Sequence, residues 1–365
     1  MTLEFLYRQP VEIRFGTGSL ASLGETLRSL GASRVVVVCD RFLRARTEEL
    51  RQSVPEIAGV FSDVEENPQL SGVEAAVRLI RETNADAVVG IGGGSTMDTA
   101  KFAAAIARSD AEAIAYFCGE RPFPMDRLPM IAVPTTAGTG SEVTQVSVIS
   151  HGSEKKTINN PAFMPRCAIV DPMLTVSVPP RTTMNTGLDA MAHALEGYWS
   201  RNHQPISDLT AIEAVRLVLE NLETAWRDGT DLKARENMSL AALLGGLSFA
   251  LPKTAGSHAC SYPLSERYHL PHGEACAFTL DSFVRINADE RLEHLARAVG
   301  LPDTDALAER IRELKRLGGL RTKLSELGEF DLDAVCREAA AHPLMRNNPV
   351  PMDEAALRRM FTALQ

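Results

Sequence analysis

Four residues in the second half of the chain have side chains of the types that bind a divalent metal ion. Asp189 and His193 are four residues apart, so on a helix they lie on one face, one turn apart. His258 and His272 are fourteen residues apart, too far for one helical face but within reach of two facing elements. One carboxylate oxygen and three imidazole nitrogens suit Fe²⁺ or Zn²⁺. Taken alone, the spacing of Asp189 and His193 also fits an ordinary pair on a helix surface.

A glycine turn in the first half of the chain is typical of a phosphate-binding site. Residues 85–91 form a short apolar run of the strand type, and residues 96–108 show helical periodicity. The turn between them consists of Gly92, Gly93, Gly94 and Ser95. Strand, glycine turn and helix in this order point free backbone N–H groups and a helix N-terminus at a phosphate. The spacing differs from G-x-G-x-x-G, so the usual dinucleotide fingerprint is absent.

A second loop follows another apolar run, residues 128–133. It spans residues 134–142 and is rich in hydroxyl groups and glycines, among them Thr135, Thr136, Gly138 and Thr139. Either loop alone could be a tight turn. Two such loops, each after an apolar strand, favour a ligand crevice at the carboxyl edge of a parallel sheet.

Four segments of the chain resemble the iron-type (group III) alcohol dehydrogenases. They are residues 92–101, 134–142, 168–172 and 186–196. The match runs in order from near residue 12 to residues 347–351, so it spans nearly the whole chain. The resemblance implies a dehydroquinate-synthase-like fold, with an α/β nucleotide-binding domain in residues 1–180 and an all-helical domain in residues 181–365. It also implies that a metal ion lies in the cleft between them.

The pattern of predicted elements agrees with this division. Short apolar runs alternate with helical stretches in the first half, which predicts a parallel sheet with helices on its faces. The predicted strands are residues 35–39, 87–91, 130–133 and 168–170, and the predicted helices include residues 22–30 and 72–82. From Thr182 onward strand patterns end and helical periodicity follows, in residues 208–226, 234–250, 290–299, 305–317 and 352–364.

Length, charge and cysteine usage restrict the class of protein. A chain of 365 residues favours two domains over one core. Its formal charge of −9 argues against nucleic acid or a membrane surface as a partner. Six scattered cysteines without a C-x-x-C pair are typical of reduced intracellular proteins. With no secretion signal or membrane span in the sequence, we expect a cytoplasmic homodimer that acts on a small aldehyde or alcohol.

Three charged residues are predicted to contact the nucleotide. Asp40 ends the first predicted strand, where a carboxylate binds the adenosine ribose and repels a 2′-phosphate. This favours NAD(H), although a turn aspartate fits the same position and the neighbouring Arg41 and Arg44 leave NADP(H) possible. Asp98 either stabilises the dipole of its helix or contacts the cofactor. The resemblance implies a cofactor-contacting lysine at the position of Lys155.

The resemblance fails four residues after His258. Related enzymes often have a further histidine there, near the nicotinamide, and this chain has Tyr262. Tyrosine donates a hydrogen bond but does not exchange a proton near neutral pH as histidine does. Tyr262 therefore remains a predicted catalytic-site residue without the proton-relay role. His269 either takes that role or lies on the surface.

Residues 253–264 resemble the members of the family that reduce phosphonoacetaldehyde to hydroxyethylphosphonate. Lys253 lies shortly before His258, and a lysine in a cleft can hold a phosphonate as a point charge. Arg267 is a second candidate for the same task. Both cations also fit solvent-facing positions, so another small aldehyde, neutral or carboxylated, is the alternative substrate.

The resemblance implies a reaction in which a metal ion acts as a Lewis acid on the aldehyde oxygen while NAD(P)H supplies a hydride. Two other classes fit part of the pattern. One is a dehydroquinate-synthase-type lyase, whose several phosphate-binding basic residues the sequence lacks. The other is a non-catalytic NAD-binding protein with a structural metal. An open coordination position distinguishes a catalytic ion from a structural one.

Overall fold

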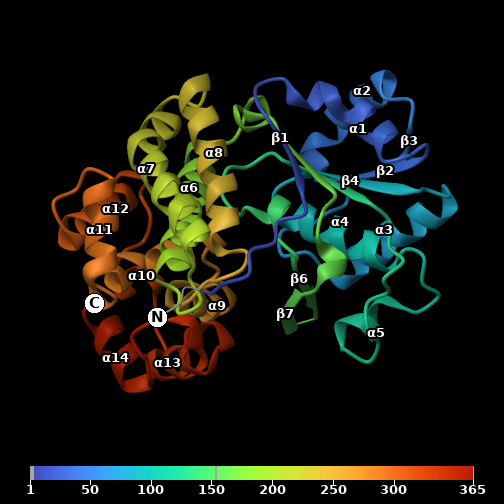
Figure 1. Cartoon of the computed structure of the whole chain (residues 1–365). Coiled ribbons are helices and arrows are strands. Elements are labelled where there is room, and N and C mark those ends of the chain that lie inside the picture. Colours follow the sequence, from blue (N-terminus) through green and yellow to red (C-terminus); the bar gives the residue numbers. More distant parts are fainter. Residues whose placement is uncertain (1–3, 153, 365) are drawn as a thin grey trace. The chain divides into compact units, whose positions relative to one another are not determined.

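The structure, a computed structural model, describes residues 4–152 and 154–364 (Figure 1). Two compact units make up this part of the chain. The α/β unit contains residues 8–136 and 141–175, and the helical unit contains residues 4–7, 137–140 and 176–364. The prediction of an α/β region followed by a helical region is confirmed.

The α/β unit is built on a six-stranded sheet in which all neighbouring strands are parallel. Its strands are β1 (Glu12–Phe15), β2 (Val35–Cys39), β3 (Ile57–Phe61), β4 (Ala87–Gly92), β5 (Met130–Pro134) and β8 (Cys167–Val170). Their order across the sheet is β1-β8-β5-β4-β2-β3. Strands β6 (Val146–His151) and β7 (Glu154–Asn159) form a separate antiparallel pair. All four predicted strands are present, whereas the sequence patterns do not predict β1, β3 or the β6–β7 pair.

Helices pack against both faces of this sheet. They are α1 (Leu23–Ser29), α2 (Arg44–Ser53), α3 (Leu70–Glu82), α4 (Gly94–Ile106) and α5 (Ala113–Phe117). Strand β2 shows the reason for this arrangement. Its side chains alternate between the two faces of the sheet and are apolar on both. Val36 and Val38 belong to one buried cluster with residues of α3 and α4, and Val35 and Val37 belong to another with residues of α1.

The loops that sequence analysis predicts for the nucleotide follow three neighbouring strands. Asp40 comes directly after β2, the glycine turn comes at the end of β4, and Thr135 comes after β5. Since β2, β4 and β5 are parallel and adjacent, all three loops emerge at one edge of the sheet.

The helical unit is built around α6 (Pro180–Trp199), which packs against α7, α8 and α10. The further helices are α7 (Pro205–Arg227), α8 (Leu232–Phe249), α9 (Gly256–Tyr268), α10 (His272–Ile286), α11 (Glu290–Ala298), α12 (Thr304–Leu317), α13 (Leu332–Ala341) and α14 (Glu354–Thr362). No strand follows Val170 in the described residues. Nor does any helix in that part of the chain combine the length and apolar character needed to cross a membrane.

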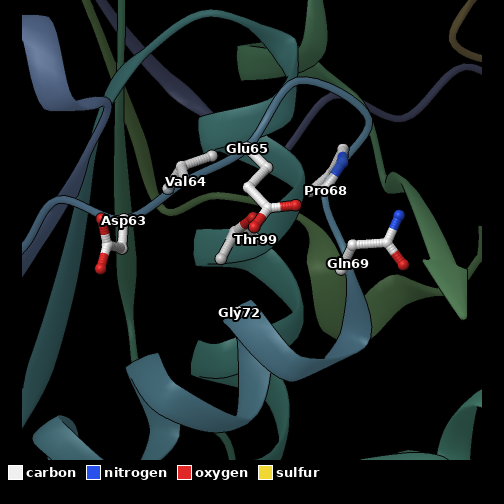
Figure 2. Close-up of a pocket in the computed structure, with 7 residues that line it drawn as sticks. All are labelled: Asp63, Val64, Glu65, Pro68, Gln69, Gly72 and Thr99. Atoms are coloured by element: carbon white, nitrogen blue, oxygen red, sulfur yellow. The ribbon is translucent and has the colours of Figure 1, made fainter.

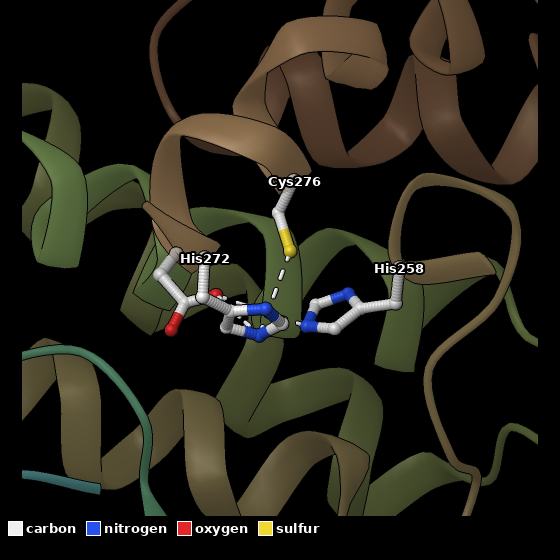
Figure 3. A group of neighbouring side chains, drawn as sticks. His258, His272 and Cys276 are labelled. Carbon is white, nitrogen blue, oxygen red and sulfur yellow. Dashed lines mark hydrogen bonds and ion pairs between the residues drawn. The ribbon is translucent and has the colours of Figure 1, made fainter. Parts of the chain in front are cut away.

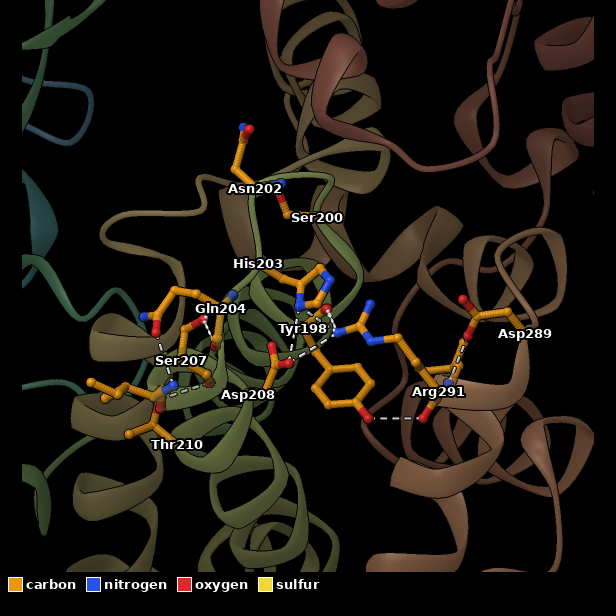
Figure 4. A network of polar contacts seen from close by, with 12 residues as sticks. Tyr198, Ser200, Asn202, His203, Gln204, Ser207, Asp208, Thr210, Asp289 and Arg291 are labelled. Atoms are coloured by element: carbon orange, nitrogen blue, oxygen red, sulfur yellow. Dashed lines mark hydrogen bonds and ion pairs between the residues drawn. The ribbon is translucent and has the colours of Figure 1, made fainter. Parts of the chain in front are cut away.

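A polar network fixes the C-terminal end of α6 (Figure 4). The Tyr198 hydroxyl donates to the Arg291 carbonyl, and Arg291 Nη2 donates to the Tyr198 carbonyl, each at 2.8 Å. The same guanidinium lies 3.1 Å from Asp208 Oδ2 on α7. The network thus joins α6, α7 and α11 just beyond the residues that form the candidate metal centre.

Candidate metal centre and nucleotide site

The four predicted metal ligands lie together in the helical unit. Asp189 and His193 lie one turn apart on α6, His258 lies in the first turn of α9, and His272 is the first residue of α10. Asp189 Oδ1 is 3.9 Å from His193 Nδ1, 3.7 Å from His258 Nε2 and 3.9 Å from His272 Nε2. The Nε2 atoms of His193 and His258 are 3.1 Å apart.

This group fits a divalent cation. Four ligands at about 2.1 Å from an ion in a tetrahedron are about 3.4 Å from one another. The distances from Asp189 Oδ1 to the Nε2 atoms of His258 and His272 are close to this value, and so is the distance between the Nε2 atoms of His193 and His258. Asp189 is 2% exposed, and its Oδ1 accepts no hydrogen bond from the described residues. A buried carboxylate oxygen without a donor is costly unless a cation compensates it. The pKa of His193 is held well below its usual value by burial and by His258 and His272, which keeps the ring neutral, as a ligand must be.

A carboxylate that the sequence analysis does not single out orients His258. Glu196, fully buried on α6, accepts a hydrogen bond from His258 Nδ1. Its Oε1 accepts the backbone N–H groups of Ser257 at 2.7 Å and His258 at 3.3 Å. Burial alone lowers the pKa of His258, but Cys276 and Glu196 together raise it well above its usual value. The Nδ1 contact leaves Nε2 directed at the other ligands, as outer carboxylates do in metal sites.

Cys276 is a second neighbour that the sequence analysis does not single out (Figure 3). It lies one turn after His272 on α10 and is fully buried. Its Sγ is 3.7 Å from His272 Nε2. The spacing of four residues after a predicted ligand is the signal that would have indicated it.

Gly273 allows α10 to approach α6 closely. A Cβ atom at this position would lie 2.1 Å from the Asn185 carbonyl oxygen and 3.2 Å from Asp189 Cβ. Since His272 precedes Gly273 directly, this close approach brings His272 to Asp189.

We expect Gly273→Ala to weaken metal binding and to lower stability by about 1–3 kcal/mol, because the added methyl group pushes α10 away from α6. Metal content per chain and thermal unfolding measure the two effects. Gly72→Ala is the matched control, since this helical glycine has no atom within 4 Å of the added Cβ. Unchanged metal content and unfolding temperature in Gly273→Ala would contradict the prediction.

In the α/β unit the two predicted nucleotide loops lie side by side. The N–H of Thr135 donates to the Gly92 carbonyl at 3.0 Å, and a Cβ on Gly93 would lie 3.6 Å from Thr136 Oγ1. Gly93 is the N-cap of α4, and the helix begins at Gly94, followed by Ser95. This geometry leaves a helix N-terminus available to a phosphate.

The same loop then enters the helical unit. A Cβ on Gly138 would lie 2.7 Å from Thr186 Cβ, and one on Gly140 would lie 2.4 Å from Gly246 Cα. Residues 137–140 therefore pack against α6 and α8 and do not stay with Thr135 and Thr136. Thr139 belongs to this segment.

Asp98 has partners within the α/β unit. Its Oδ2 accepts the N–H of Val148 at 3.0 Å, and its Oδ1 accepts the Ser141 hydroxyl at 3.3 Å. Burial raises the pKa of Asp98 to about 6 against the opposing charge of Lys101. These contacts tie α4 to β6, so a structural role is established within this unit and a cofactor contact stays a prediction. Lys155 donates to Asn67 Oδ1 at 2.8 Å, and its cofactor role also stays a prediction.

A pocket of about 260 Å³ lies in the α/β unit and is lined in part by Leu43, which belongs to the turn that Asp40 caps. Its apolar lining includes Leu20, Leu43, Ile91 and Leu174, each in or just after the carboxyl end of a strand. Asp40 caps the short 3₁₀ helix Arg41–Leu43 and accepts the N–H of Leu43 at 3.1 Å. A pocket lined in part by apolar side chains, beside the turn that follows β2, suits an adenosine.

A second, smaller pocket lies beside α3 and α4 (Figure 2). Its volume is about 20 Å³, which is room for roughly one water molecule. It is too small for a substrate or a nucleotide.

We expect Asp40→Gly to raise the kcat/KM ratio of NADPH to NADH, because it removes the repulsion between this carboxylate and a 2′-phosphate. Steady-state kinetics with both nucleotides measure the ratio, and Asp63→Gly, a change in another loop of the same unit, is the control. A wild type that already prefers NADPH by a wide margin would show that Asp40 is wrongly assigned.

Tyr262 stacks on His342, with ring centroids 4.3 Å apart. Burial, and then His258, lowers the pKa of His342 to about 4, so the ring is neutral near pH 7. His342 is not among the site residues predicted from the sequence. The alternative relay residue, His269, is exposed at the C-terminal end of α9, about 16 Å along the helix from His258. The suggestion that His269 acts at the metal centre is therefore wrong.

The two predicted substrate cations have different surroundings. Arg267 pairs with Glu338 at the surface and lies about 13 Å along α9 from His258, so the structure does not bring it to the metal centre. Lys253 is partly buried in the loop between α8 and α9. That loop begins after Phe249, whose ring stacks on His193 with centroids 4.2 Å apart, and ends just before His258.

Comparison with known proteins agrees with this geometry. The family model "Iron-containing alcohol dehydrogenase" matches residues 10–172, and "Fe-containing alcohol dehydrogenase family, C-terminal" matches residues 183–364. The long-chain-alcohol dehydrogenase 1 of Geobacillus thermodenitrificans is 36% identical, over 95% of this chain and 93% of that protein. The 1,3-propanediol dehydrogenase of Citrobacter freundii is 32% identical over 98% of both chains.

Among solved structures, the sulfoacetaldehyde reductase from Bifidobacterium kashiwanohense, in complex with NAD⁺, is similar with a TM-score of 0.96. It is 40% identical, and the match covers 100% of this chain and 99% of that one. The chain belongs to the iron-containing alcohol dehydrogenase family. It is an oxidoreductase of the alcohol and aldehyde dehydrogenase class.

Proposed function

We propose that this enzyme reduces a small aldehyde with a strongly acidic group, phosphonoacetaldehyde or its sulfonate counterpart, with NADH and a divalent metal ion. The observation that supports this substrate class is the environment of Lys253. The similarity to a sulfoacetaldehyde reductase is consistent with it. Sequence resemblance favours the phosphonate, and the structural neighbour favours the sulfonate. Both groups are tetrahedral oxyanions of similar size.

Lys253 is a partly buried cation without an anionic partner. Its Nζ donates to the Ala250 carbonyl at 2.8 Å, and it forms no ion pair with any described residue. Burial lowers the pKa of Lys253, with no carboxylate to oppose the effect. An uncompensated ammonium is costly to bury, and an anionic substrate group would compensate it.

The backbone at Lys253 supports the same interpretation. Its φ of 70° lies in the left-handed region, which a lysine seldom adopts. Such conformations persist where the surrounding structure enforces them and are frequent at ligand-binding positions. Two hydrogen bonds hold the backbone on either side of Lys253. The Ser200 hydroxyl donates to the Pro252 carbonyl, and the Asn347 side-chain amide donates to the Thr254 carbonyl.

The residues of this chain would have separate roles in the reaction. Asp189, His193, His258 and His272 would hold an Fe²⁺ or Zn²⁺ ion, and Glu196 orients His258. Lys253 would bind the acid group and so fix the orientation of the aldehyde. The bound groups supply Lewis-acid polarisation of the carbonyl oxygen and a hydride from the nicotinamide.

We further propose that NADH is preferred over NADPH because of Asp40, and that Fe²⁺ supports activity. The homodimer and the cytoplasmic location stay predictions. Membership of the alcohol dehydrogenase family argues against a dehydroquinate-synthase-type lyase and against a non-catalytic NAD-binding protein.

A panel of aldehydes tests the proposal. The enzyme reconstituted with Fe²⁺ or Zn²⁺ is mixed with NADH and with phosphonoacetaldehyde, sulfoacetaldehyde, succinic semialdehyde or propanal, and the loss of NADH absorbance is followed. We expect kcat/KM for at least one of the strongly acidic aldehydes to exceed that for propanal by about tenfold or more, which corresponds to about 1.4 kcal/mol. Equal values for propanal would contradict the acidic substrate class.

A further inference from the structure

The candidate metal centre has a sulfur atom on one side. Ligand atoms of Asp189, His258, His272 and Cys276 all lie within 4.8 Å of one another (Figure 3). Three of these residues belong to the set proposed above, and the fourth offers a thiol in place of His193. Cys276 is fully buried, and its Sγ lies 3.7 Å from His272 Nε2 on the side of this group.

A cysteine alone does not define a metal site, but a second observation points to a cation in the same space. Asp189 Oδ1 is buried and accepts no hydrogen bond from the described residues, and it faces the same group of atoms. The helix geometry also holds the thiol in place. Because His272 and Cys276 are one turn apart on α10, both side chains project from one face of that helix toward Asp189.

We propose that Cys276 Sγ is a further ligand of the bound ion, so that this chain offers three nitrogens, one oxygen and one sulfur. This inference rests on the proposed function, in which Asp189, His193, His258 and His272 hold the metal ion. On binding, the thiol proton passes to water, and a sulfur lone pair forms the bond to the ion. A thiolate is a soft ligand, so it raises the preference of the site for Zn²⁺ over Fe²⁺ compared with a set of nitrogen and oxygen alone.

Cobalt substitution tests this directly, because a thiolate bonded to Co²⁺ gives an intense charge-transfer band in the near ultraviolet that nitrogen and oxygen ligands do not give. The apoenzyme is titrated with Co²⁺, and the spectrum and the bound metal are measured together. We expect one equivalent of Co²⁺ and the band in the wild type. Cys276→Ser should bind Co²⁺ without the band, and its Zn²⁺-to-Fe²⁺ affinity ratio should fall about tenfold.

Cys336→Ser is the matched control, since Cys336 is another fully buried thiol of the helical unit. It should keep the band. A wild type that binds Co²⁺ without the band would overturn the role of Cys276 and leave the metal site standing, and this result needs no variant to fold. A band that persists in Cys276→Ser would also overturn it. A wild type that binds no Co²⁺ would overturn both this inference and the metal site.

Discussion

His272→Ala is expected to abolish turnover, with a loss of about 10²-fold or more in kcat, and to lower the amount of bound metal. Three remaining ligands hold a divalent ion less well than four, and without the ion the carbonyl oxygen loses its Lewis acid. His272 is the ligand best suited to this test because its side chain is 46% exposed, so truncation removes little packing. Elemental analysis and NADH-linked rates on the same preparations measure both effects.

His294→Ala is the control for this experiment, since His294 is an exposed histidine on α11. It should keep full metal content and activity. Unchanged metal together with full activity in His272→Ala would remove His272 from the site. Addition of excess Fe²⁺ should restore part of the lost activity if the variant binds the ion weakly but keeps the rest of the centre.

Lys253→Met is expected to raise the KM for the acidic aldehyde about ten- to a hundredfold while leaving the KM for propanal nearly unchanged. A charge-assisted contact in a partly buried position contributes roughly 1.5–3 kcal/mol, and methionine keeps most of the apolar stem. Lys253→Ala should give the same result with some additional loss of packing. Steady-state kinetics with both aldehydes measure the effect.

Arg267→Met is the matched control, because Arg267 is a cation in the same region of sequence whose charge pairs with Glu338. It should change neither KM. Equal losses on both aldehydes in Lys253→Met would mean that Lys253 supports the loop and does not bind substrate.

The sequence predicts the central strands, and it indicates the four side chains that the structure brings together in the candidate metal centre. Strand β2, with five apolar residues in succession, can only be buried on both faces. The ligands are predictable because a helical spacing fixes the pair on α6 and because the family resemblance supplies His258 and His272.

Other elements lack a local signal. Strand β3 contains Gly59, and β7 is rich in charged and polar residues, so neither shows a strand pattern of its own. Helix α9 is buried over its first two turns and shows little helical periodicity, and α10 is buried over most of its length. Glu196 and Cys276 lie at helical spacing from predicted ligands, but only the packing of α9 and α10 on α6 shows that they belong to the centre.

The division of the chain between the two units has a consequence for how the protein can be cut and assembled. The main chain passes from one unit to the other four times, after residues 7, 136, 140 and 175. A fragment that starts at residue 181 would therefore lack the 137–140 segment, whose glycines fill the space beside Thr186 and Gly246. Neither unit is a continuous stretch that a single cut can release intact. Gene halves of this enzyme are for that reason poor building blocks for chimeras. When nucleotide-binding units are exchanged between relatives, residues 137–140 must come from the same protein as the helical unit against which they pack.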